Sequence, residues 1–199
     1  TEIQMLADRE HFTKIVGLLA SKGNTDYSQY KHSTIFRRIQ RRMGLNQIDS
    51  MSKYYVFLKQ SPLETASLDQ EMLIGVTRFF RDPDAMRFLE QRVVPEICQR
   101  AEPGAIIRIW TPGCSTGEEA YSLGMLFLEQ ISAMDKFVEV KIFATDIDHK
   151  AIEFGAIGAY PESIATDVSQ ERLERFFIKR GGAYQVSHRL REAVVFTRH

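Results

Sequence analysis

The chain is organised around one short stretch, residues 108–122, in which a strand-forming run passes through a glycine-bearing turn into a helical pattern. Residues 106–110 are rich in β-forming side chains, and the run stops at Pro112-Gly113. Apolar residues then recur at helical spacing: Tyr121, Leu123, Leu126 and Phe127. In open α/β sheets ligands bind outside the carboxyl ends of the strands, so we expect a ligand site at this turn.

The acidic residues of the turn indicate which ligand suits it. A pyrophosphate on this helix N-terminus would be repelled by Glu118 and Glu119. The spacing of Gly113 and Gly117 also differs from the Gly-x-Gly-x-x-Gly of nicotinamide and flavin binders. A nucleoside with cationic groups and no phosphate, such as S-adenosylmethionine, fits better. The turn equally fits a capping box, in which the Ser115 hydroxyl and the Glu118 carboxylate bond to helix N–H groups.

Composition sets broad limits. The 199 residues are 44% hydrophobic, which is enough for one large or two small packed domains, and 26 basic residues balance 26 acidic ones. No apolar run approaches the ~20 residues of a membrane span, and no signal-peptide pattern is present, so we expect a cytoplasmic protein without membrane insertion. Cys98 and Cys114 have no paired spacing and the histidines are scattered, so we expect neither a disulfide nor a metal site.

The first part of the chain, residues 1–74, has the patterns of four short helices. Asp8 is predicted to cap the first helix and Gly23 to end it. The others are predicted over residues 31–46, 51–59 and 64–74. Together they would form a small helical bundle.

The second of these helices is amphipathic and cationic, with an apolar stripe at Ile35, Ile39 and Met43. Its basic cluster has three interpretations: a solvated face, a nucleic-acid site, or a surface that docks onto an acidic protein. Nucleic acid has no further support, because neither aromatic interleaving nor a known motif accompanies the cluster. The cluster comprises Arg37, Arg38, Arg41 and Arg42.

The pattern changes at Gly75. Asp82 and Pro83 are predicted to be the N-cap and the first residue of a helix that runs to about Arg92. The turn at 102–104 then leads into the first strand.

Acidic residues follow the second predicted strand, residues 138–144. In nucleotide-binding α/β units, a carboxylate at the end of the second strand accepts hydrogen bonds from the ribose hydroxyls, and Asp146 occupies that place. Asp148 is better placed to cap the helix that begins near His149. Each acid alone is typical of a cap or turn, but the Gly113 turn one strand earlier favours a ligand role for Asp146.

The remainder of the chain predicts a helix at 169–176, two short strands around 180–183 and a third main strand at 194–197. A doubly wound sheet has several more strands after the third. We therefore expect the α/β domain to be incomplete within this chain.

Four motifs, in this order and spacing, resemble the chemotaxis protein-glutamate methyltransferases of the CheR type. The motifs are Gly-Val-Thr-Arg-Phe-Phe-Arg-Asp from Gly75, Pro-Gly-Cys-Ser-Thr-Gly-Glu-Glu-Ala-Tyr-Ser from Pro112, Phe-Ala-Thr-Asp-Ile-Asp from Phe143 and Gly-Ala-Tyr-Pro-Glu-Ser from Gly158. The basic helix precedes them, so the resemblance covers nearly the whole chain.

The resemblance implies an α/β protein in which an all-helical domain, 1–74, precedes a partial Rossmann-like S-adenosylmethionine-dependent methyltransferase domain, 75–199. Residues 75–104 would be the linker and first helix of the second domain. The implied activity is that of a protein-glutamate O-methyltransferase. It would esterify glutamates on the cytoplasmic helices of chemoreceptors in chemotaxis adaptation and release S-adenosylhomocysteine.

The resemblance also assigns roles to residues. Glu118 would contact the amino-acid part of the cofactor and Asp146 its ribose. Thr77 and Arg81 would lie near the methyl group, with Arg81 as the catalytic residue that positions the acceptor carboxylate. Further cofactor contacts would come from Gly75, through its backbone, and from Gly113. The arginines of the basic helix would meet the acidic receptor surface.

The sequence departs from the family at its end. The family usually continues past the third strand with an Asn-Leu pair and a tyrosine-bearing stretch, neither of which is in this chain. A non-catalytic module that docks on receptors or senses S-adenosylmethionine is therefore the alternative hypothesis. A nicotinamide-dependent oxidoreductase is a third, which the glycine spacing and Glu118 both oppose.

Overall fold

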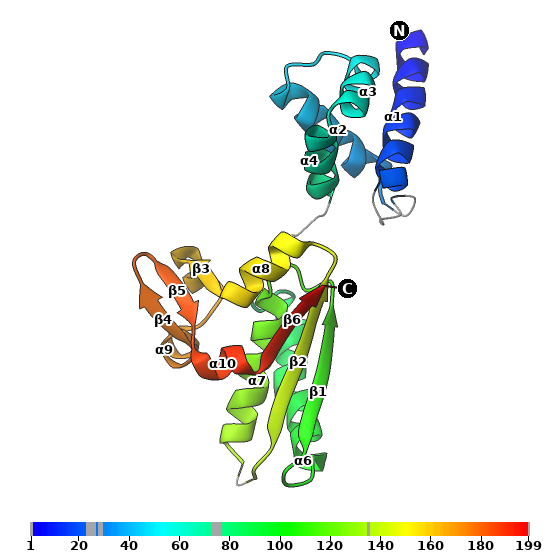
Figure 1. Ribbon diagram of the computed structural model, residues 1–199. Coiled ribbons are helices and arrows are strands. Elements are labelled where there is room, and N and C mark those ends of the chain that lie inside the picture. The colour runs from blue at the N-terminus through cyan, green and yellow to red at the C-terminus, as the bar shows by residue number, and fades with distance from the viewer. Residues whose placement is uncertain (1, 23–26, 28–29, 73–76, 135, 199) are drawn as a thin grey trace. The chain divides into compact units, whose positions relative to one another are not determined.

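The structure is a computed structural model that describes residues 2–22, 27, 30–72, 77–134 and 136–198 (Figure 1). The chain divides into two compact units, Thr1–Ile74 and Gly75–His199. Each unit has a hydrophobic core of its own. The two units are therefore described separately.

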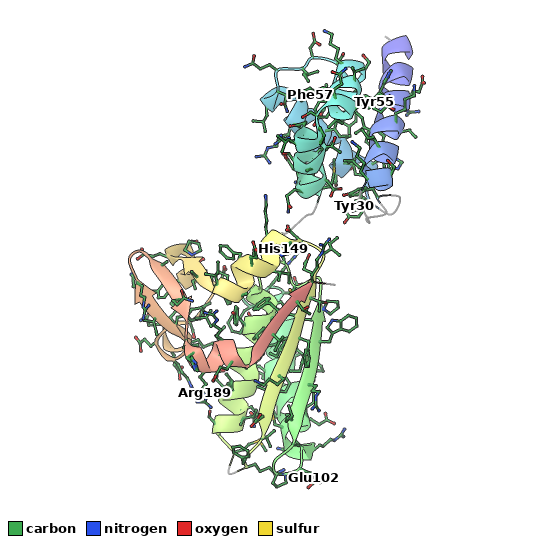
Figure 2. The ribbon with its side chains drawn as sticks, in the orientation of Figure 1. Tyr30, Tyr55, Phe57, Glu102, His149 and Arg189 are labelled. Carbon is green, nitrogen blue, oxygen red and sulfur yellow. The ribbon has the colours of Figure 1, made fainter. Side chains whose placement is uncertain are left out.

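The N-terminal unit is helical and contains α1 (Glu2–Lys22), α2 (His32–Leu45), α3 (Met51–Gln60) and α4 (Pro62–Met72). All four helices were predicted, but the start of the first was wrong: α1 begins at Glu2, so Asp8 lies within the helix and is not its cap. The predicted end at Gly23 lies outside the described residues. Figure 2 shows Tyr55 and Phe57 on α3; both pack against the core of the unit.

The core of this unit comes from side chains at helical spacing on several helices. The fully buried ones include Ile15, Leu19, Ile35, Ile39, Leu58 and Leu68. The i, i+4 pairs on α1 and α2 place one stripe of each helix against the others, as amphipathic helices require. Ser50 caps α3 by accepting a hydrogen bond from the backbone N–H of Lys53.

The second unit begins its regular structure with one long helical segment made of α5 (Pro83–Phe88), a π-helical turn η2 (Leu89–Val93) and α6 (Val94–Arg100). Pro83 is its first residue, as predicted. Asp82 is the N-cap, as predicted, but its side chain makes no capping hydrogen bond. Asp82 has a left-handed backbone, φ 56°, and only its carbonyl oxygen joins the helix, accepting from Met86 N.

The main sheet has three parallel strands in the order β1 (Ile106–Pro112), β2 (Glu139–Asp146), β6 (Val194–Arg198). This α/β arrangement of a parallel sheet with helical crossovers agrees with the predicted fold class. Helix α7 (Glu118–Ser132) joins β1 to β2 and packs on β2, while α8 (His149–Ile157) follows β2 and packs on β6 (Figure 1). Because the strands are parallel, β1 and β2 end at the same edge of the sheet.

A smaller antiparallel sheet has the order β3 (Ala159–Pro161), β5 (Ala183–Val186), β4 (Phe177–Arg180). The β4–β5 hairpin was predicted, and its two-residue turn, Gly181-Gly182, has positive φ at both positions. Strand β3 was not predicted, because three residues show no alternation. Between β3 and β4 lie η3 (Glu162–Thr166) and α9 (Gln170–Phe176), and α10 (His188–Glu192) leads from β5 to β6. Arg189 of α10 donates to the Ser132 hydroxyl at the end of α7 (Figure 2).

Candidate functional site

The turn after β1 has a left-handed backbone at every second residue: Gly113 at φ 66°, Ser115 at φ 49° and Gly117 at φ 93°. The two glycines have different neighbours. A Cβ at Gly117 would lie 2.6 Å from the Phe196 ring, whereas a Cβ at Gly113 would have no protein atom within 4 Å. Gly117 is therefore required by packing, while the backbone at Gly113 borders open space that a ligand can approach.

Asp146, at the end of β2, ties this turn to the next one. Its two carboxylate oxygens accept from the backbone N–H groups of Ser115, at 2.7 Å, and Asp148, at 2.8 Å. The partly buried carboxylate is thus fixed between the ends of two neighbouring strands. Asp148 accepts from Lys150 N and Ala151 N and caps α8 just before His149 (Figure 2), which confirms its predicted role.

Glu118 is the first residue of α7, and its partly buried carboxylate accepts a hydrogen bond of 2.6 Å from the Thr116 hydroxyl. Burial raises the pKa of Glu118 above its ordinary value, and the Thr116 hydrogen bond opposes that rise. No side-chain cation among the described residues pairs with this carboxylate.

The capping-box interpretation of this turn is wrong. Gly117 is the residue before α7, and no side chain caps it. Ser115 stands two positions earlier with a left-handed backbone, so its N–H points to Asp146 and its hydroxyl cannot reach the helix N–H groups. The buried Ser115 hydroxyl has no hydrogen-bond partner within the described part of the chain. Such a group is expected where a ligand completes the site.

A cavity of about 290 Å³ adjoins the turn. Thr77 and Glu118, which were predicted from separate motifs, both line it, together with Thr116, Phe154 and Tyr160. Arg78 and Asp167 also line it and approach each other to 3.9 Å. The cavity therefore combines aromatic walls with two partly buried acids, Glu118 and Asp167, of which only Asp167 has a cation near it among the described residues.

The segment that carries Thr77 and Arg81 is anchored by two of the three residues between them, Phe79 and Phe80. Phe79 is buried, with its ring 4.9 Å from that of Tyr160 and 5.6 Å from that of Phe177. The N–H of Phe80 donates to Ser122 Oγ at 3.0 Å, and that hydroxyl in turn donates to the carbonyl oxygen of Glu118 at 2.7 Å. Ser122 thus links this segment to the first turn of α7.

The backbone on either side of Arg81 is unusual. Phe80 has φ 49° and Asp82 φ 56°, conformations that cost energy for residues other than glycine and persist only where the surroundings impose them. The Arg172 guanidinium lies 4.6 Å from the centre of the Phe80 ring. Arg172 itself bonds to Glu129 through two nitrogens, at 3.0 and 2.8 Å, and to Glu90. Arg81 is exposed on this constrained turn.

Of the predicted site residues, the structure brings Thr77 and Glu118 to one cavity and links the Gly113 turn to Asp146. Gly75 lies outside the described residues. Sequence reasoning missed Thr116, Tyr160 and Phe154. Tyr160 was visible only as part of a motif, and Phe154 is like any apolar residue of a helix; both join the site through tertiary contacts.

The basic helix α2 has the predicted buried stripe of Ile35, Ile39 and Met43. Its arginines are not equivalent. Arg42 grips Glu64 of α4 through Nε, at 2.9 Å, and Nη2, at 2.5 Å, and Tyr54 donates to the same carboxylate at 2.7 Å. The side chains of Arg42 and Glu64 are only 20% and 7% exposed, so this ion pair lies inside the unit.

The other three arginines differ again. Arg41 is exposed and reaches Glu71 at 2.9 Å, and Arg37 is exposed. Arg38 is partly buried, and its Nε has no partner among the described atoms. Contact with an acidic partner stays a prediction, and Arg37 and Arg41 are the members of the cluster that lie exposed on the unit.

The two units match the two parts of one protein family. Residues 10–73 match the CheR methyltransferase all-alpha domain, and residues 75–199 match the CheR methyltransferase SAM binding domain. The fold and these matches define the class as an S-adenosylmethionine-binding α/β domain preceded by an all-helical domain. The chain belongs to the CheR methyltransferase family, and S-adenosylmethionine is the cofactor of its second domain.

Relatives extend along almost the whole chain. An "Uncharacterized 104.1 kDa protein in hypE 3'region" of Rhodobacter capsulatus is 42% identical over 194 residues, which are 98% of this chain and 20% of that protein. "Chemotaxis protein methyltransferase 2" of Vibrio cholerae is 26% identical over 99% of this chain and 66% of its own length. "Probable chemotaxis protein methyltransferase" of Rhizobium etli is 31% identical over 85% and 65%. The chain thus spans a fifth of the first relative and about two thirds of the other two.

The residues present fit the cofactor. The unpartnered Ser115 hydroxyl, the open backbone at Gly113 and the acid Glu118 on the cavity wall offer polar groups to a cationic nucleoside. Among the helices that the structure describes, none combines the length and apolarity needed to cross a membrane.

Proposed function

We propose that this protein uses S-adenosylmethionine to methylate glutamate side chains on the cytoplasmic helices of chemoreceptors, forming glutamate methyl esters. The observation that carries the proposal is the meeting of Thr77 and Glu118 on one cavity beside the turn that Asp146 holds. The names of the Vibrio and Rhizobium relatives favour chemotaxis as the setting.

The proposed contacts follow from the free bonding capacity of each group. An ionised carboxylate can accept about four hydrogen bonds, and Asp146 uses one on each oxygen, so capacity is left for two ribose hydroxyls. Glu118, which has no cation of its own among the described residues, would receive the ammonium of the cofactor's amino-acid part. The backbone at Gly113, and that of Gly75, would approach the cofactor closely.

When bound, the cofactor supplies a methyl group on a positively charged sulfur, which an ionised carboxylate attacks to leave neutral S-adenosylhomocysteine. The acceptor glutamate, with an ordinary pKa near ~4.3, is already ionised at neutral pH, so the chain need not supply a general base. Its task is alignment and exclusion of water. Thr77 would lie beside the methyl group, and Arg81, on its constrained turn, would orient the acceptor carboxylate.

The test is transfer of radiolabelled methyl from S-adenosylmethionine to a chemoreceptor cytoplasmic fragment. Glutamate methyl esters release the label as methanol in mild alkali. Label that survives alkali would contradict the proposal, because amide or amine methylation is alkali-stable. Arg81→Ala should lower the transfer rate more than it lowers cofactor affinity, since it is proposed to position the acceptor.

The alternative function is a module that binds S-adenosylmethionine and docks on a partner without transfer. The Rhodobacter relative favours it as a second candidate, because there the matched region is only 20% of a much larger protein. Calorimetric measurement of S-adenosylmethionine binding, made on the same preparation as the transfer assay, distinguishes the methyltransferase from the non-catalytic module. Cofactor binding with a receptor fragment captured but never labelled would establish the module.

A further inference from the structure

A chain of two hydrogen bonds connects the smaller sheet to Glu118. The Tyr160 hydroxyl, on β3, donates to the carbonyl oxygen of Thr116 at 2.6 Å. The Thr116 hydroxyl then donates to Glu118 Oε2 at 2.6 Å. Tyr160 is thus joined through Thr116, 44 positions away, to Glu118, 42 positions away. Thr116 and Glu118 lie on either side of Gly117, which has a left-handed backbone.

Tyr160 is held rigidly. It is 1% exposed, and its ring meets those of Phe79 at 4.9 Å, Phe154 at 5.5 Å and Tyr121 at 6.2 Å, all edge to face. Burial raises the pKa of Tyr160 above its ordinary value, so the phenol stays protonated. It therefore remains a donor to Thr116 at neutral pH.

Thr116 needs such a support. It lies between Ser115 and Gly117, both of which have positive φ, so the regular hydrogen bonds of a helix or strand do not hold its backbone. A Tyr160 bond to its carbonyl fixes the peptide, and the fixed peptide directs the hydroxyl toward Glu118. The carboxylate in turn lines the cavity.

We propose that Tyr160 and Thr116 are positioning residues, which hold the Glu118 carboxylate ionised and directed into the cavity for the cationic amino-acid end of the cofactor. This inference rests on the cofactor contact proposed above for Glu118. Neither residue is proposed to touch the reacting atoms.

A pH signature follows from the environment of Glu118. Burial favours its neutral form and the Thr116 hydroxyl favours its charged form. The titratable or charged groups around it are Tyr160, Cys114, Glu119, Asp146 and the Arg78–Asp167 pair. Burial raises the pKa of Cys114 to about 12, so the thiol, like Tyr160, stays neutral between pH 5.5 and 8. Loss of the Thr116 hydroxyl should therefore move the protonation of Glu118 to higher pH.

The experiment is calorimetric titration of the full chain with S-adenosylmethionine between pH 5.5 and 8. Thr116→Val should weaken binding about tenfold at pH 8, the size expected for a lost hydrogen bond to a charge, and should shift the affinity fall-off to higher pH. Thr116→Ser should restore both affinity and fall-off. Tyr160→Phe should weaken binding less, since it removes only the hydrogen bond to the Thr116 carbonyl and leaves the bond from Thr116 to Glu118 in place.

Controls separate the two levels of the inference. Thr13→Val, which removes an exposed hydroxyl on α1 bonded to the Arg9 carbonyl, should behave as wild type. Thr116→Ala serves if the valine variant does not fold. Glu118→Gln should bind about tenfold or more weakly at pH 8, with a flat pH profile.

Two results would overturn the inference, at different levels. If Glu118→Gln weakens binding while Thr116→Val and Thr116→Ala match the Thr13→Val control, the positioning role is wrong and the cofactor contact survives. If Glu118→Gln binds as wild type, the contact itself is wrong, and the positioning role falls with it.

Discussion

Two glutamates with opposite environments distinguish the two units of the molecule. Glu64, in the helical unit, is held by Arg42 and Tyr54. Burial alone would raise its pKa, but these bonds outweigh burial and hold the pKa below its ordinary value. Glu118, in the α/β unit, has a hydroxyl but no cation beside it among the described residues, and burial raises its pKa. A buried carboxylate with its cation is structural; one that lacks a cation and lines a cavity is suited to bind a cationic ligand.

The largest expected effect is on the stability of the helical unit. Glu64→Gln removes the nearer of the two carboxylates beside the largely buried Arg42 guanidinium and leaves only Glu71, at 3.8 Å. This loss should cost about 3 kcal/mol of unfolding free energy. Urea denaturation followed by circular dichroism measures it. Glu10→Gln, which removes an exposed carboxylate on α1, is the matched control and should leave the transition unchanged. An equal midpoint for the two variants would show that the ion pair is not structural.

The same substitution at Glu118 should do the opposite. Glu118→Gln removes a charge that burial disfavours, so the α/β unit should unfold at the same or a slightly higher urea concentration. Its cost should appear only in S-adenosylmethionine affinity. Loss of stability comparable to that of Glu64→Gln would remove the distinction between the two glutamates.

The pH dependence of stability should also have opposite signs. The folded-state pKa of Glu64 is lowered, so its contribution is present above the unfolded value near ~4.3 and is lost as pH falls below it. The folded-state pKa of Glu118 is raised, so its ionised form weakens folding, and that penalty appears as pH rises through the raised pKa. Thermal unfolding of wild type, Glu64→Gln and Glu118→Gln between pH 3.5 and 7 tests both signs. If the melting temperatures of all three proteins change with pH in the same way, the opposite signs predicted for Glu64 and Glu118 are wrong.

The smallest effect on stability is expected for the exposed arginines. Arg37→Glu combined with Arg41→Glu should change the unfolding free energy by no more than about 1 kcal/mol, because both arginines are exposed and Glu71, the partner of Arg41, keeps Arg42 at 3.8 Å. If the basic helix docks on an acidic receptor surface, the same change should abolish capture of a receptor fragment at low salt. Capture that persists would exclude docking through these two side chains. Arg42→Glu is unsuitable for this test, because it would break the internal pair with Glu64.

Much of the site was predictable because its residues follow element boundaries. Asp146 and Asp148 directly follow a strand, and Gly113 and Glu118 flank a strand–turn–helix junction, so local pattern places them at one sheet edge. The Ser115 hydroxyl was predicted wrongly for the same local reason. The sequence of a capping box is present, but the left-handed backbone at Ser115 moves its hydroxyl out of reach of α7.

By itself, the sequence determined the order of the main helices and of the three main strands, the buried stripe of α2, the Asp148 cap and the family, because each follows from the spacing of neighbouring residues. Only the tertiary structure decided that Arg42 is neutralised by Glu64, 22 positions away, while Arg37 stays exposed. It alone brought Tyr160 to Thr116, 44 positions away. Whether a charged side chain pairs with another residue inside the protein or remains available to a ligand depends on contacts between distant parts of the chain. The periodicity of a single helix or strand does not predict those contacts.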